Sequence, residues 1–137
     1  MKRFLLIACV CAALATPVSA ASLFEDLGGQ TGLTKITNDM VDIALADPRI
    51  KDSFAETNIP RLRDLLYQHF CELTGGPCTY KGRDMVKSHA PLKLRDLHFN
   101  ALAEDLEIAM ERSNIPWSVQ ARFLAILAPM RPEIVTR

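Results

Sequence analysis

Apolar residues recur along the chain at spacings of three and four, and no strand-like alternation bounded by turns interrupts them. This period predicts α-helices, and the expected fold class is all-α. Four substantial helices are expected, with inner faces formed by the following residues: Leu33, Ile36, Met40, Val41 and Leu45 in the first; Leu62, Leu65, Leu66, His69 and Phe70 in the second; Phe99, Leu102, Leu106 and Met110 in the third; Val119, Phe123, Ile126 and Leu127 in the fourth.

Glycine, proline and capping residues predict where these helices begin and end. A short turn over residues 23–27 precedes Gly28-Gly29, Pro48 ends the first long helix, and residues 50–54 form a connecting turn. Asn58 is expected to cap the second helix, which Gly75-Gly76-Pro77 stops. Residues 77–88 are expected to form a loop that leads into one helical turn around His89, limited by Pro91. The third helix is predicted over Asp96–Arg112, and the fourth begins near Pro116.

The first 20 residues are typical of a secretory signal peptide. Lys2 and Arg3 precede an apolar run, and Val18-Ser19-Ala20 provides a small-residue cleavage site. The apolar run is too short to span a membrane, which takes about 20 residues. A lipidation site at Cys9 is the less favoured alternative, because few apolar residues precede it. We therefore expect a periplasmic or secreted protein whose single domain covers residues 21–137.

Charge and cysteine content narrow the possible functions. Without Lys2 and Arg3 the chain keeps 14 basic and 16 acidic residues with no run of either sign, so nucleic acid is not an expected partner. The mature chain retains Cys71 and Cys78, an even pair in an oxidising compartment, which favours a disulfide. This spacing, without a nearby histidine pair, is a poor zinc signature. No Cys-x-x-Cys-His motif for covalent haem attachment occurs.

His89, in the stretch Met85-Val86-Lys87-Ser88-His89-Ala90-Pro91-Leu92, is the candidate metal ligand. A neutral imidazole nitrogen suits iron, and globin-type haem proteins hold the metal through one such ring. Taken alone, a single histidine near a helix end more often caps or packs. The remaining sequence decides between these two interpretations.

Four landmarks follow one another along the chain: Leu23-Phe24-Glu25-Asp26-Leu27-Gly28-Gly29; Leu45-Ala46-Asp47-Pro48-Arg49-Ile50 with Phe54; Gly75-Gly76-Pro77 with Tyr80 and Gly82; and Met85 to His89 with His98-Phe99 beyond. In this order they resemble a group 1 truncated haemoglobin over residues 23–135. The resemblance implies a two-over-two helical sandwich that encloses a haem. It further implies that His89 binds the haem iron. Residues expected to contact the haem are Phe54, Leu62, Leu66, Phe70, Met85 and Phe99. The final helix contains no histidine, so the link that some cyanobacterial relatives form there is excluded, and non-covalent haem b is expected.

The expected distal side departs from the better-known family pattern. Many relatives place tyrosine and glutamine where this chain has Val41 and Leu66, so the pocket is expected to be apolar and high oxygen affinity is in doubt. His69 lies seven residues after Leu62, about 10.5 Å along the same helix face. It is interpreted as a satisfied packing histidine, with a role near the ligand as the alternative. Arg63 and Arg83 are equally compatible with haem propionates and with solvated surface positions.

The resemblance implies a protein that binds a diatomic gas, oxygen, nitric oxide or carbon monoxide, reversibly opposite His89. One alternative is a nitric oxide dioxygenase-like enzyme, which requires a stable oxygen complex and a reductant. A second is a helical module without haem, which the presence of both His89 and Phe54 argues against. His98 competes weakly as iron ligand, because its family counterpart is not the ligand.

Overall fold

A computed structural model describes residues 21–136, so the expected signal peptide lies outside the described residues. All regular elements in this range are helical, which confirms the predicted fold class. None of the described helices has the length and apolar character that a membrane span requires. The α-helices are α1 (Leu23–Asp26), α2 (Gly29–Ala46), α3 (Ile59–Leu73), α4 (Met85–His89), α5 (Asp96–Arg112), α6 (Trp117–Leu127) and α7 (Arg131–Ile134), with 3₁₀ turns at Lys51–Phe54, Ala90–Leu92 and Ala128–Met130.

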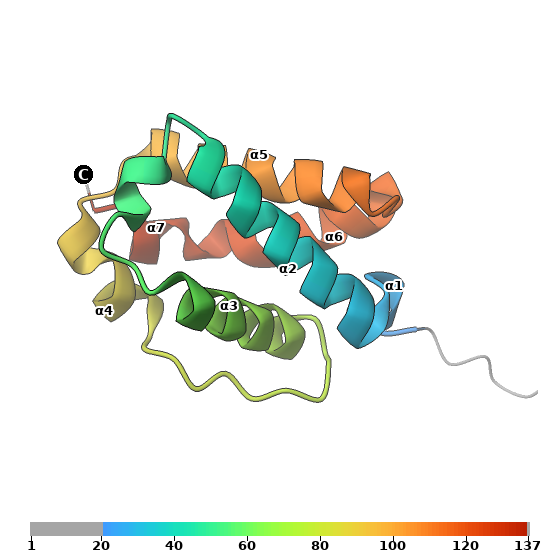
Figure 1. Ribbon diagram of the computed structural model, residues 1–137. Coiled ribbons are helices and arrows are strands. Elements are labelled where there is room, and N and C mark those ends of the chain that lie inside the picture. Colours follow the sequence, from blue (N-terminus) through green and yellow to red (C-terminus); the bar gives the residue numbers. More distant parts are fainter. Residues whose placement is uncertain (1–20, 137) are drawn as a thin grey trace, which may run out of the picture.

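Two antiparallel helix pairs form the body of the fold. The helices α2 and α3 run in opposite directions, as do α5 and α6, and the long α2 packs against both α3 and α5 (Figure 1). The short α4 lies at the end of this arrangement and contacts α7, which follows α6 after the 3₁₀ turn Ala128–Met130. The chain therefore brings its last helix onto the turn that carries His89.

The hydrophobic core lies where α2 meets the other long helices. Its largest fully buried apolar side chains are those of Leu27, Leu33, Ile36, Met40, Met110 and Phe123. Most residues predicted on the inner faces of α2 and α5 are buried as expected, since helical spacing of three and four places them on one side. On α6 only Phe123 of the four predicted residues is fully buried, while Val119, Ile126 and Leu127 lie half-buried at the border of the core.

Local signals fix most helix ends where the sequence predicts them. The Asn58 side chain accepts a hydrogen bond from the backbone N–H of Arg61 at 3.0 Å and so caps α3. Gly28 precedes α2 with a φ of 91°, a conformation that glycine adopts without a steric cost. The helix α5 spans the predicted range. A single helical turn is present at His89 as predicted, but it already begins at Met85, so residues 85–88 are helical and not part of the predicted loop. The four-residue α7 is not anticipated by the sequence pattern.

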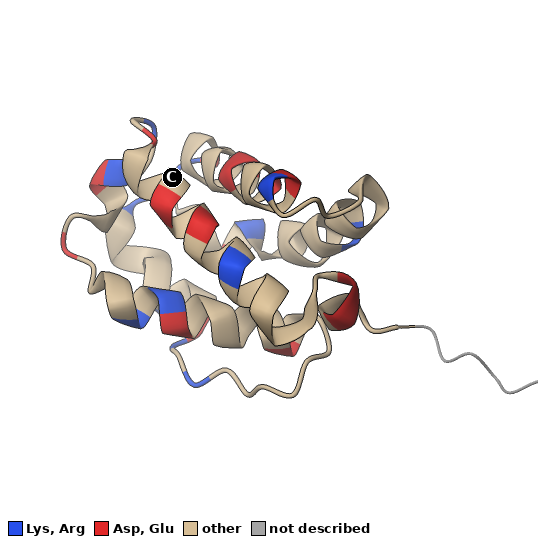
Figure 2. Ribbon diagram, turned by 45° about the vertical axis from the view of Figure 1, so that its right-hand side comes forward, with Lys and Arg blue, Asp and Glu red and all other residues tan. Residues whose placement is uncertain are grey.

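Acidic and basic residues are interspersed over the helices (Figure 2). Several form ion pairs between elements, including Arg63 with Asp42, Arg122 with Asp26 and Arg131 with Asp96. These partly exposed pairs connect α3 to α2, α6 to α1 and α7 to α5. Exposed pairs of this kind each contribute on the order of 0–1 kcal/mol, so packing provides most of the stability.

Candidate haem site

His89 is the last residue of α4, and its ring is oriented by a hydrogen bond within the same turn. The Nδ1 atom lies 2.7 Å from the carbonyl oxygen of Met85. Because a carbonyl oxygen only accepts hydrogen bonds, Nδ1 carries the proton and the lone pair resides on Nε2. A backbone carbonyl that holds the other ring nitrogen is the usual second partner of a metal-binding histidine. The ring is thus prepared to bind iron through Nε2.

The start of α4 is stabilised by its own capping contacts. The Asp84 side chain accepts a hydrogen bond from the backbone N–H of Lys87 at 2.8 Å. This hydrogen bond and the neighbouring Lys87 ammonium lower the pKa of Asp84. The Ser88 hydroxyl donates to the Asp84 carbonyl at 2.7 Å. A helix this short depends on such caps, because it has few internal hydrogen bonds.

The loop before α4 is attached to α3 at three points. The backbone N–H groups of Tyr80 and Lys81 donate to the side chains of Glu72 and Gln68, each at 3.3 Å. A disulfide joins Cys71 at the end of α3 to Cys78 in the loop, with 5.7 Å between their Cα atoms. The Tyr80 hydroxyl donates to the carbonyl of Arg83 at 2.8 Å, just before α4. The loop therefore couples the position of α4, and with it His89, to α3.

The apolar residues expected around the haem come from four separate elements. Phe54 follows α2 and packs beside Ala44, Ile50 and Ala101, and Phe99 lies in the first turn of α5. Five of the six expected residues are half-buried: Phe54, Leu62, Leu66, Met85 and Phe99. Large apolar side chains that remain partly accessible can cover a further apolar group such as a porphyrin. These residues and the free Nε2 of His89 fit a haem.

Phe70 has a different environment from the other expected contacts. It is 5% exposed and belongs to the main core, where its ring meets the Phe123 ring edge to face at 5.1 Å between centroids. Its role as a haem contact stays a prediction. Val41 is also in this core, and Leu66 packs at its border, so neither provides a polar group.

His69 has buried ring nitrogens without protein partners. Among the described residues, neither Nδ1 nor Nε2 has a hydrogen-bond partner. Its ring lies 4.7 Å from the Tyr80 ring, between centroids. Burial is the main cause of its lowered pKa, and the nearby Glu72 carboxylate partly offsets this effect. The interpretation of His69 as a packing histidine whose hydrogen bonds are satisfied is therefore wrong, because its ring packs but its nitrogens have no protein partner.

The arginines near the site have distinct partners. Arg63 donates to the Asn38 carbonyl at 2.8 Å and pairs with Asp42, so its guanidinium is bound to α2. Arg83 is exposed in the loop. Arg131, which no sequence pattern marks as a site residue, lies over the ring of Phe99. Sequence periodicity cannot reveal this contact, because α7 has only four residues.

His98 is engaged at the start of α5. Its Nδ1 accepts a hydrogen bond from the backbone N–H of Arg95 at 2.9 Å. The ring thereby caps the helix. His98, the weaker candidate for the iron ligand in the sequence, therefore has a structural role as a helix cap.

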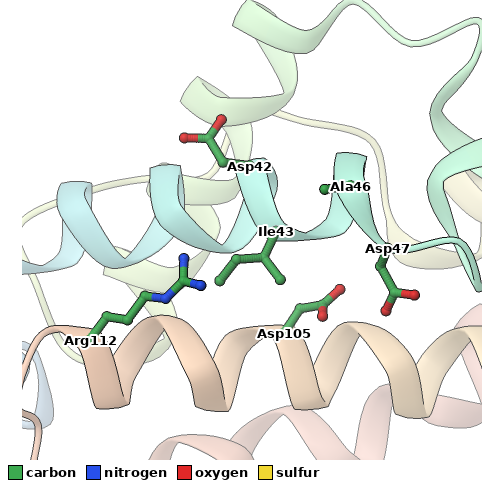
Figure 3. Close-up of a pocket in the computed structure, with 6 residues that line it drawn as sticks. All are labelled: Asp42, Ile43, Ala46, Asp47, Asp105 and Arg112. Carbon is green, nitrogen blue, oxygen red and sulfur yellow. The ribbon is translucent and has the colours of Figure 1, made fainter.

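A separate pocket of about 370 Å³, largely open to the surface, lies between α2 and α5. Figure 3 shows Asp105 on α5 and Asp47 at the end of α2 with their carboxylates directed toward one another. Asp105 is 1% exposed, and its Oδ2 has no hydrogen-bond partner among the described residues. Burial, together with the charge of Asp47, raises the pKa of Asp105 to about 6. An acidic residue within the apolar stripe of Leu102, Leu106 and Ala109 is the sequence signal that marks this position.

The family follows from comparison with known proteins. The profile of the family described as Bacterial-like globin matches residues 22–136. The chain belongs to this family. The globin is 29% identical over 116 residues to the group 1 truncated haemoglobin GlbN of Mycolicibacterium paratuberculosis, covering 85% of each chain. It is 31% identical over 94 residues to the group 1 truncated haemoglobin of Tetrahymena thermophila, covering 69% of this chain and 78% of the relative.

Solved structures of truncated haemoglobins have the same fold as this globin. The Fe(III) form of the Tetrahymena pyriformis protein superposes with a TM-score of 0.83 at 25% identity, covering 85% of this chain and all of that chain. The 2/2 haemoglobin of Synechococcus sp., described in the cyanomet state with covalently attached haem, gives 0.80 at 26% identity and the same coverage. The predicted resemblance to group 1 truncated haemoglobins is confirmed. Membership implies haem with iron and haem-based gas binding.

Proposed function

We propose that this globin binds a diatomic gas reversibly at a haem iron held by Nε2 of His89. The observation that carries the proposal is the 2.7 Å hydrogen bond from His89 Nδ1 to the Met85 carbonyl, which leaves the lone pair of Nε2 free to bind iron. A haem held by His89 would supply the iron at which a gas molecule could bind. The chain supplies the orienting carbonyl and the apolar side chains that limit access of water.

Replacement of the iron ligand tests this function directly. His89→Ala is expected to abolish haem retention, since no other imidazole takes over its hydrogen-bonded geometry at the end of α4. His98→Ala is the matched control, because it removes a histidine whose role is to cap α5. Absorption spectra after haem loading measure both variants. Unchanged haem content in the His89 variant contradicts the proposed ligand.

The haem is proposed to be held without a covalent bond. The support is the composition of the C-terminal part, because residues 113–137 contain no histidine. Extraction into acidic organic solvent measures this property. Haem that leaves the protein supports non-covalent binding, and haem that stays with the polypeptide contradicts it.

Reversible binding is favoured over a nitric oxide dioxygenase. Such a reaction needs a stable oxygen complex, and Val41 and Leu66 provide no hydrogen bond for it. It also needs a reductant, from which export to the periplasm would separate the protein. Nitric oxide is added repeatedly to the oxygenated protein with a reductant present. A single round of consumption supports the binding function, whereas sustained turnover supports the enzyme.

The protein is proposed to be exported and to carry the Cys71–Cys78 disulfide. The support is the basic and apolar pattern of residues 1–20 and the bridge between α3 and the following loop. Intact mass after expression with export machinery tests both parts. A chain that starts at Ala21 and is two hydrogen masses lighter than the reduced form is expected. Retention of residues 1–20 contradicts export, and free thiols contradict the bridge.

A further inference from the structure

The Cys71–Cys78 bridge lies between two parts of the candidate haem site. The helix α3 carries two of the apolar residues expected to contact the haem, and α4 carries His89. Residues 74–84 join these two helices without a helix of their own. The bridge fastens this loop to the end of α3, so only residues 79–84 remain between the covalent anchor and α4.

The other attachments of this loop to α3 are weak. The backbone N–H groups of Tyr80 and Lys81 donate at 3.3 Å to side chains of α3, at the surface where water competes for the same groups. The helix α4 has five residues, and a helix of that length is not stable by itself. The bridge is therefore the main restraint on the position of α4 from the side of α3.

The two sulfur atoms of the bridge differ in access. Cys71 is fully buried in the main core. Cys78 is half-buried at the border of that core, and its Sγ lies 3.8 Å from the Tyr67 hydroxyl. Thiol–disulfide exchange requires a thiolate to approach one of the two sulfurs. Cys78 is thus the position at which a reductant can open the bridge.

We propose that the Cys71–Cys78 bridge is a redox switch that sets how firmly α4 presents His89, a role that rests on the proposed haem binding through His89. In the oxidised form the loop is anchored at Cys78, and the His89 ring stays where the Met85 carbonyl orients it. In the reduced form the whole loop between α3 and α4 is free, so α4 opens more often. Each opening moves His89 away from its binding position, and the reduced protein therefore releases haem faster.

The reductant in this switch is a dithiol, either a protein or a small molecule. One thiolate of the dithiol attacks Cys78 Sγ, and Cys71 Sγ leaves with the electron pair of the broken bond and takes up a proton. The second thiol attacks the mixed disulfide, closes the disulfide of the reductant and releases the Cys78 thiolate, to which the nearby Tyr67 hydroxyl can donate. Two electrons and two protons pass to the cysteine pair, and an oxidised dithiol reverses the reaction.

Haem loss and amide exchange test the switch in the haem-loaded protein. The wild type is compared with the bridge intact and after reduction by dithiothreitol, with free thiols counted in each sample. Transfer of ferric haem to an excess of apomyoglobin gives the rate of haem loss, and hydrogen exchange of residues 85–89 gives the opening of α4. Reduction is expected to raise both rates about fivefold or more. Reoxidation with oxidised glutathione is expected to restore them.

Two sets of variants serve as controls. Cys71→Ala with Cys78→Ala has no bridge, so it should lose haem at the rate of the reduced wild type and should not respond to dithiothreitol. Leu33→Ala truncates a fully buried side chain of α2 and lowers the overall stability outside the loop. Its haem loss and its exchange at residues 85–89 should stay near those of the oxidised wild type, in buffer in which urea titration shows every protein to be folded.

Several outcomes would exclude the switch. Unchanged rates after reduction of the wild type would show that the bridge does not control α4. Equal rates in the reduced wild type and Leu33→Ala would assign the effect to general stability. A response of the double cysteine variant to dithiothreitol would assign it to the haem iron, and a bridge that dithiothreitol cannot open in the folded protein would be a permanent brace.

Failure of the switch and failure of the proposed function are distinguishable. Haem retention by His89→Ala contradicts the proposed iron ligand. The exchange of residues 85–89 follows the opening of α4 whichever residue binds the iron, so it reports on the bridge alone.

Discussion

The guanidinium carbon of Arg131 lies 4.5 Å from the centre of the Phe99 ring. The same guanidinium pairs with Asp96 and donates to the Asn100 side chain at 2.7 Å. Arg131 thus joins α7 to the first turn of α5, at a residue expected to line the haem. A cation over an aromatic face is worth roughly 0.5–1 kcal/mol at an exposed position.

Removal of this contact is expected to loosen the haem. Arg131→Ala should increase the rate of haem loss by a few-fold, because Phe99 and α7 lose a shared anchor. Transfer of haem to an excess of apomyoglobin measures this rate. Arg122→Ala, which removes a surface pair with Asp26 on α1, is the control. Equal rates for both variants would show that the Phe99 contact has no influence on the haem.

Asp105→Asn is expected to change how stability depends on pH. The pKa of Asp105 is about 6 in the folded chain and about 3.8 as its ordinary value. The folded state therefore binds this proton more tightly than the unfolded state. The resulting contribution to stability is present in full below about pH 4 and is lost as the pH rises to about 6. The loss amounts to roughly 1–3 kcal/mol.

Chemical unfolding of the haem-loaded protein from pH 4.5 to pH 8 measures the effect. The Asn variant should be more stable than the wild type at pH 7.5, with the difference shrinking toward pH 4.5, because its amide does not ionise. The control is Asp52→Asn, at an exposed position. A constant difference between wild type and Asp105→Asn over this range would contradict the raised pKa.

The bridge between α3 and the loop is expected to contribute to stability. Cys71→Ala with Cys78→Ala should lower the free energy of unfolding by roughly 2–3 kcal/mol, the loop-closure contribution for a short ring. Urea unfolding of the oxidised wild type and the double variant gives this difference. Reduction of the wild type should produce a similar loss. A double variant as stable as the oxidised wild type would exclude a stabilising bridge.

Gly76 is expected to tolerate no side chain. A Cβ atom there would lie 2.6 Å both from Cys71 Sγ and from Phe24 Cδ2. Gly76→Ala should therefore destabilise the protein by roughly 1–3 kcal/mol through overpacking. Thermal unfolding measures the loss, with Thr79→Ala at an exposed position of the same loop as control. In the double variant, Phe24→Leu should relieve part of the loss caused by Gly76→Ala. Losses of stability that simply add in the double variant would contradict this clash.

Several features of the fold could be predicted from the sequence because the residues that determine them are neighbours along the chain. The range Asp96–Arg112 is recoverable from helical spacing and its flanking residues, and Asn58 with Pro60 marks the start of α3. The motif around His89 identified it as the candidate ligand, and the structure places it at the end of a single turn as predicted, although that turn begins at Met85, within the range predicted as loop. The half-buried positions of α6 could not be predicted in the same way, since periodicity identifies which face of a helix is apolar but not how deeply that face is buried.

What the sequence alone determined was the all-helical class, the extents of the long helices, the family resemblance and the candidate iron ligand. These depend on periodicity, caps and motifs that act over a few neighbouring residues. Only the tertiary structure decided that the ring nitrogens of His69 have no hydrogen-bond partner among residues 21–136, that Asp105 holds its proton to about pH 6, and that Arg131 covers Phe99. Desolvation and hydrogen-bond satisfaction depend on groups from distant segments, which come together only when the helices pack.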